Sequence, residues 1–142
     1  MPNTTVMMGN SQEFANLTGP ICRADGWYGH RDGLHTVSIQ VVNFTGRVYI
    51  EASLASAPTE EDWFPIALQP ETPYVEFPLN PLKPTGSFYI GGDTMVIGRS
   101  FKINALWLRA RMDRSYLEDI LFEEDPNVLP RYGNVVKVVL AR

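Results

Sequence analysis

Cys22, His30 and His35 are the residues of this 142-residue chain that could bind a transition metal, because thiolate and imidazole groups are the usual zinc ligands. Their spacing matches no zinc-binding module, and a single cysteine cannot form an internal disulfide. Nothing in the sequence marks Cys22 as an activated nucleophile, and the Gly-x-Ser-x-Gly turn of serine hydrolases is missing. We therefore expect no metal and no cofactor.

Two acidic clusters, Glu60-Glu61-Asp62 and Glu123-Glu124-Asp125, could in principle supply the paired carboxylates of a glycosidase. Each cluster adjoins a proline-containing loop, where solvated charge is the ordinary explanation. Gly91-Gly92 lacks the Lys-Ser/Thr pair of a phosphate-binding loop. These patterns predict a protein that is not an enzyme.

The segment 25–33 carries the side chains best suited to recognition. Trp27, Tyr28 and Arg31 lie between two Asp-Gly pairs that favour turns. Aromatic residues with arginine are typical of interface hot spots, and also of platforms on which sugars stack. Packing of the loop against the core, a protein interface and a ligand site all remain open. We take these three residues as candidate interface residues.

Residues 1–20 show no persistent period of two or of 3.6. Their spaced apolar residues include Met7, Met8 and Phe14, which are costly to leave in water. We predict that 1–20 is an extended arm in contact with another molecule, with these three residues in the interface, and that 21–142 is the folded domain. The protein would then be a homo-oligomer or a subunit bound to a larger assembly.

The composition excludes some classes of partner. Twelve Lys and Arg against sixteen Asp and Glu give a formal charge of -4, which argues against nucleic acid as a partner. No stretch approaches the ~20 apolar residues of a membrane span, so we expect no membrane. The first residues also lack the charged region and apolar core of a signal peptide.

Alternation of apolar and polar residues predicts the fold. It runs through 36–41 and 47–54, where Asn43 and Gly46 suggest a β-hairpin, and through the strongest run, 101–112. A β-branched run, 135–140, closes the chain, and a short helical turn is predicted at 115–122. The fold class is all-β, a single antiparallel β-sandwich of jelly-roll or immunoglobulin-like type. The predicted core is Val37, Ile39, Val41, Val48, Ile50, Leu54, Leu106, Leu108 and Met112. We expect Arg109, Arg111 and Arg114 to form ion pairs with neighbouring strands.

Three stretches carry a resemblance to a known group of proteins: Gly46–Leu54 followed by Trp63, Trp107–Asp113, and Gly133–Val138. Together they resemble the small β-sandwich virion proteins of tailed bacteriophages over residues 36–142, although the Asp-Gly of the first loop is replaced by Ala57-Pro58-Thr59. The resemblance implies a structural role in the virion. That role would be a capsid decoration (cement) protein bound to the major capsid protein or another virion protein, or a neck or tail component. The resemblance implies no catalytic residue. A carbohydrate-binding module that uses Trp27, Tyr28 and Trp63 is the alternative.

Overall fold

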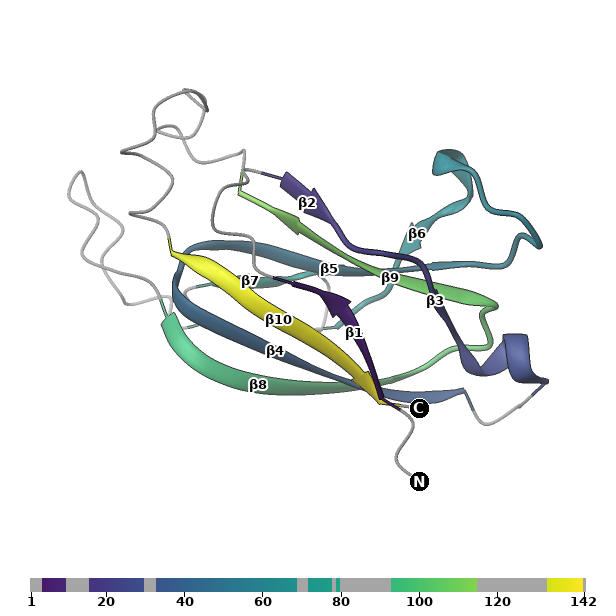
Figure 1. Ribbon diagram of the computed structural model, residues 1–142, viewed down its shortest axis with the longest axis horizontal. Coiled ribbons are helices and arrows are strands. Elements are labelled where there is room, and N and C mark those ends of the chain that lie inside the picture. The colour runs from purple at the N-terminus through teal and green to yellow at the C-terminus, as the bar shows by residue number, and fades with distance from the viewer. Residues whose placement is uncertain are drawn as a thin grey trace.

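Two antiparallel sheets form the computed structural model, which describes residues 4–9, 16–29, 33–68, 72–77, 79, 93–114 and 133–141 (Figure 1). The first sheet has the order β1-β10-β4-β8, with bounds Thr4–Met8, Asn134–Ala141, Leu34–Phe44 and Asp93–Lys102. The second has the order β2-β9-β5-β6, with bounds Asn16–Thr18, Trp107–Asp113, Gly46–Ser53 and Phe64–Pro65. Short strands β3 (Cys22–Arg23) and β7 (Val75–Phe77) pair with β9 and β5, and the 3-10 turns are η1 (Asp25–Tyr28) and η2 (Glu60–Asp62). The all-β sandwich is thus confirmed.

The core lies between the sheets and follows the predicted alternation. Seven of the predicted core residues are buried, at 1% exposure or less: Val37, Ile39, Val41, Val48, Ile50, Leu108 and Met112. Two are not. Leu54 is 61% exposed because β5 ends at Ser53, and Leu106 is half-buried because it precedes β9. Periodicity holds only inside a strand, so it fails at these two ends.

The predicted hairpin at Asn43–Gly46 is wrong. β4 pairs with β10 and β8 in the first sheet, whereas β5 pairs with β9, β6 and β7 in the second. The connection is therefore a corner that carries the chain from one sheet to the other. Asn43 has a φ of 51°, and Phe44 turns into the core against Phe77, at 5.6 Å between ring centroids. Burial of this aromatic pair is favourable, and it favours the corner over a hairpin that would keep both strands in one sheet.

The predicted strand 101–112 is two strands. Phe101 belongs to β8 and Trp107 begins β9, so the chain changes sheets again at 103–106. Ala105 is fully buried there, and the Leu106 N–H donates to the Ser53 carbonyl oxygen at 3.1 Å. Most of β8 was missed, because Gly98 and Arg99 interrupt its alternating pattern.

The N-terminal arm is also corrected where the structure describes it. β1 pairs antiparallel with β10, from Thr4 opposite Ala141 to Met8 opposite Val138. A register shift between Val6 and Met8 lets two consecutive side chains enter the core, and Met7 and Met8 are 0% and 1% exposed. They are core residues of their own domain and not interface residues. β10 thereby gains a neighbour on each side, which protects its backbone groups.

Several predictions fall outside the described residues. They are the interface residues Phe14 and Arg31, the histidine at position 30, the helical turn at 115–122 and the acidic cluster at 123–125.

Candidate interaction surface

The turn η1 carries Trp27 and Tyr28, and the backbone of the β8–β9 connection fixes its position. The Ala24 and Gly26 N–H groups donate to the carbonyl oxygens of Leu106 and Ala105, at 2.9 and 3.0 Å. A Cβ at Gly26 would lie 2.4 Å from the Ala105 oxygen, so only glycine fits this approach. The two aromatic residues are therefore presented by a turn that is tied down at its base.

His35, in β4, holds both ends of the loop that contains η1. Its Nδ1–H donates to the Gly33 carbonyl oxygen at 2.8 Å, and its Nε2 accepts the Asp25 N–H at 3.2 Å. That pairing corresponds to the neutral ring protonated on Nδ1. The ring is fully buried and stacks on Phe101 at 5.4 Å with an interplanar angle of 13°. His35 therefore has a structural role that occupies both ring nitrogens.

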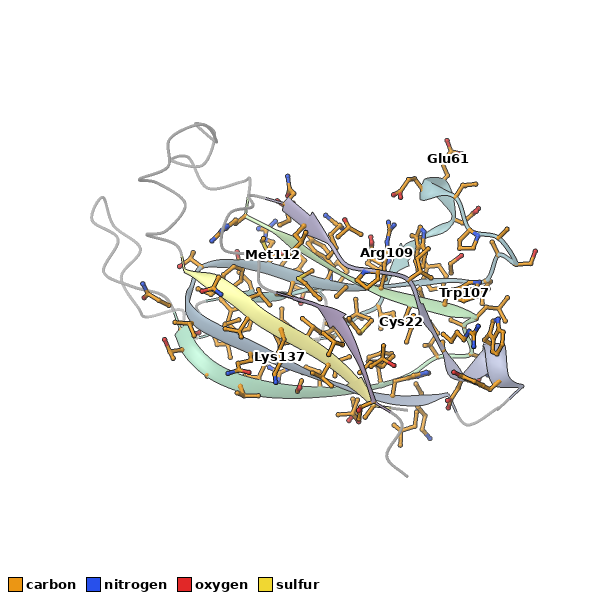
Figure 2. The ribbon with its side chains drawn as sticks, viewed as in Figure 1. Cys22, Glu61, Trp107, Arg109, Met112 and Lys137 are labelled. Carbon is orange, nitrogen blue, oxygen red and sulfur yellow. The ribbon has the colours of Figure 1, made fainter. Side chains whose placement is uncertain are left out.

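Aromatic rings gather around Trp107 at the η1 end of the sandwich (Figure 2). Trp27 meets Tyr28 edge to face at 5.1 Å and lies 6.2 Å from Trp107. The Arg23 guanidinium stacks over Trp27 at 4.0 Å, and Arg23 is also the register partner of Trp107 across β3 and β9. The Trp107 Nε1–H donates to the Ala55 carbonyl oxygen at 2.9 Å, which fixes that ring.

Large parts of this aromatic cluster remain accessible to a partner. Trp27 is 42% and Tyr28 40% exposed. Two exposed aliphatic residues lie close in sequence to the register partners of Trp107: Ile21 is two residues before Arg23, and Leu54 follows Ser53. We define the end patch as Ile21, Arg23, Trp27, Tyr28, Leu54 and Trp107. Exposed aromatic side chains beside an arginine and aliphatic residues match the composition of interface hot spots.

Beyond the end patch, ion pairs cover the outer face of the second sheet. Arg109 Nε donates to Glu51 at 2.9 Å, and its terminal nitrogens reach Glu60 at 3.2 Å. Arg111 contacts the second oxygen of Glu51 at 3.4 Å. The ion pairs predicted for these two arginines are confirmed. Arg114 is fully buried and donates to the Gly133 carbonyl oxygen at 2.6 Å.

The charge of Arg109 is held in place by these carboxylates. Burial lowers the pKa of Arg109, but the hydrogen bonds that Arg109 donates to Glu60 and Glu51, together with the negative charge of these carboxylates, outweigh this effect and raise the pKa above its ordinary value. The guanidinium therefore stays protonated, and Glu51, whose side chain is 9% exposed, bridges it to Arg111.

Guanidinium groups also stack on the rings of this face. Arg109 lies 4.4 Å from the Trp63 ring centroid, and Arg111 lies 4.0 Å from that of Tyr49. Arg47 lies 4.5 Å from Tyr74 and also pairs with Glu76 at 3.3 Å. One face of each ring is thus taken by the protein itself. Such stacking leaves these rings poorly suited as sugar platforms.

The candidate residues therefore divide into groups. Trp27 and Tyr28 share one exposed patch, Met7 and Met8 lie in the core, and Phe14 and Arg31 are not described. Sequence reasoning missed Arg23 and Ile21, which no local pattern marks, and it misplaced Leu54 in the core. Trp107 could have been found, because its position opposite the core face of its strand was already predicted.

Within the described residues, no group of three His, Cys, Asp or Glu side chains is placed to hold a metal ion. No helix in that part of the chain is long and apolar enough to cross a membrane. Comparison with protein-family profiles, with curated proteins and with solved structures gave no match.

Proposed function

We propose that this protein is a non-enzymatic structural component of a phage-like virion, a capsid decoration protein that acts through protein–protein contacts. The observation that carries the proposal is the end patch, where Trp27 and Tyr28 stay about two-fifths exposed although the turn beneath them is tied to the core. A fixed aromatic patch loses little side-chain entropy on binding, which favours a protein partner. The partner would be the major capsid protein or another virion protein.

The sequence resemblance and the sandwich architecture support the same role. The resemblance spans both strands that carry the face beside the end patch, β5 and β9. On that face arginines and carboxylates compensate one another, so the surface is rigid and nearly neutral. A rigid face of this kind suits a subunit that must keep its shape in a repeating assembly.

Carbohydrate binding is the second candidate, because the exposed Trp27 and Tyr28 rings could stack on a sugar. Arg23 already covers one face of Trp27, and Trp63, the additional candidate platform, lies under Arg109. These contacts weigh against a flat platform and favour the protein interface.

Immunogold microscopy tests the proposal on virus particles purified from the source of the sequence, with an antibody against the protein. We expect label on the heads. Label at the neck or tail would show that the protein is a neck or tail component and not a capsid decoration protein. Unlabelled particles would overturn the virion proposal altogether.

A binding assay then tests the end patch. Tagged protein is co-sedimented with particles that lack it, and Trp27→Ala is expected to weaken binding at least tenfold, the loss typical of a hot-spot residue. Phe64→Ala is the matched control, because Phe64 is 38% exposed but lies on β6, outside the end patch. Saturable binding on a glycan array that Trp27→Ala abolishes would instead establish the carbohydrate module.

A further inference from the structure

The outer face of the first sheet differs sharply from that of the second. Its residues are short, and most are uncharged. Val6, Val139, Ser38 and Gly98 form one continuous row across β1, β10, β4 and β8, since each is the register partner of the next. Thr4, Ala141, Thr36 and Ser100 form a second row in the same way. None of these eight residues is buried.

This face also exposes apolar side chains. Val96 is 62%, Val6 56% and Val42 43% exposed. The face carries Lys137 and Lys102, and the two rows between them hold no charge. A solvent-facing sheet normally bears polar and charged side chains, and depletion of charge around exposed apolar residues marks the centre of an interface.

Gly98 adds an independent observation. A Cβ at this position would meet only the Val37 carbonyl oxygen, at 3.9 Å, and its φ is not in the left-handed region. The fold therefore does not require glycine here, although glycine weakens a strand interior. Glycine in a strand often marks the close approach of another backbone.

We infer that the outer face of the first sheet binds a second copy of this chain, about a two-fold axis that lies between the copies and runs parallel to the strands. This axis places β1 of one copy over β8 of the other, and β10 over β4. The exposed Val6 of each copy then faces the partner's Gly98, and Val139 faces Ser38. Each larger side chain thereby meets a smaller one.

The same axis also prevents repulsion between the Lys137 side chains of the two copies. Lys137 is the register partner of Gln40, so the two-fold rotation places each ammonium over the partner's Gln40 and keeps the two Lys137 side chains apart. An amide oxygen can accept a hydrogen bond from an ammonium group. A highly charged partner would gain nothing from the uncharged rows, whereas a second identical face needs no opposite charge.

The area of the face is adequate for a dimer. Three spacings of about 4.8 Å separate β1 from β8, so the four strands span roughly 14 Å, and the path from Thr36 to Val42 adds roughly 20 Å in the other direction. With its exposed side chains, such a face buries less than the ~800 Å² per partner of a standard interface, which is the size of a weak dimer that forms as the protein concentration rises. This inference does not depend on the virion role, and the purified protein alone can test it.

Sedimentation velocity over a range of concentrations is the first test. We expect the wild type to dimerise and Gly98→Val to stay monomeric without loss of thermal stability, because a valine side chain finds room and favours a strand. Thr18→Val, on the outer side of β2 in the other sheet, is the control and should dimerise like the wild type. A monomeric wild type at all concentrations, or a Gly98→Val variant that still dimerises, would overturn the inference.

A cross-linking experiment tests the axis. The double variant Thr4→Cys with Ser100→Cys is treated with a bismaleimide that spans about 10 Å, the separation of packed sheets, because the axis places Thr4 of each copy over the partner's Ser100. Within one chain the two positions are three strand spacings apart, roughly 14 Å, beyond this reach. Covalent dimer is expected from the double variant and from neither single variant, and the buried native Cys22 gives the background. A dimer that resists cross-linking in the double variant would refute this arrangement.

Discussion

Glu51 is the residue on which the charged face of the second sheet depends. Its carboxylate is nearly buried and contacts Arg109 through one oxygen and Arg111 through the other. Arg109 is itself only 7% exposed, and its other carboxylate partner, Glu60, is 87% exposed. Solvent screens Glu60, so Glu51 supplies most of the compensation for the buried guanidinium.

We therefore predict that Glu51→Ala lowers the free energy of unfolding by about 3 kcal/mol, because it leaves a buried charge without its main partner. Urea denaturation followed by tryptophan fluorescence measures this loss. Glu76→Ala is the matched control. Glu76 pairs with Arg47, but the Glu76 side chain is 45% exposed. Its removal should therefore lower the free energy of unfolding by less than about 1 kcal/mol. Equal losses in the two variants would show that burial does not set the strength of these pairs.

At the scale of elements, the corners between the sheets depend on tight backbone approaches. Gly133 precedes β10 with a φ of 66°, and a Cβ there would lie 2.2 Å from the carbonyl oxygens of Val42 and Asn43. The end of β4 and the start of β10 thus pack backbone against backbone. The buried Arg114, which follows β9, also donates to the Gly133 carbonyl oxygen. Gly133 therefore connects the start of β10 with the end of β4 and the end of β9.

Gly133→Ala should lower the free energy of unfolding by more than about 2 kcal/mol. The alanine would have to adopt the left-handed conformation of Gly133, and its Cβ would clash with backbone atoms that cannot move independently. Thermal unfolding by circular dichroism measures the effect. Gly9→Ala is the control, since nothing lies within 4 Å of a Cβ at Gly9 and its φ is ordinary. A Gly133→Ala variant as stable as Gly9→Ala would mean that the β4–β10 contact is looser than described.

For the whole molecule, β1 makes the N-terminus part of the fold. It protects one edge of β10 and contributes Met7 and Met8 to the core. Replacing a buried methionine by alanine typically costs 2–5 kcal/mol, and small domains have only about 5–15 kcal/mol in total.

Deletion of residues 2–8 is accordingly expected to abolish the cooperative melting transition. The truncated chain would expose the core and leave the edge of β10 unpaired. Differential scanning calorimetry, with light scattering to detect aggregation, tests this. Val6→Ala is the control, since Val6 is 56% exposed and its loss should leave the melting temperature of the monomer nearly unchanged. A truncated protein that melts like the full chain would restore the free arm expected from the sequence.

Sequence patterns determined the parts of this protein that depend on local physics. Alternation predicted the inward faces of β4, β5 and β9, because side chains in a strand point to opposite sides whatever the strand pairs with. The same logic predicted a sandwich, and it placed Arg109 and Arg111 on a face where carboxylates lay opposite. Trp27 and Tyr28 stood out because turn residues surround them, and both are exposed in the fold.

Only the tertiary structure decided which strands are neighbours. The Asn43–Gly46 turn signal fits both a hairpin and a corner between sheets, and burial of Phe44 against Phe77 selects the corner. Met7 and Met8 have no periodic pattern, because a register shift turns both inward and the core that receives them is built by distant strands. The end patch and the two uncharged rows of the first sheet likewise join residues far apart in the chain. Pairing across long sequence separations depends on the sum of many packing contacts, and no local segment contains that information.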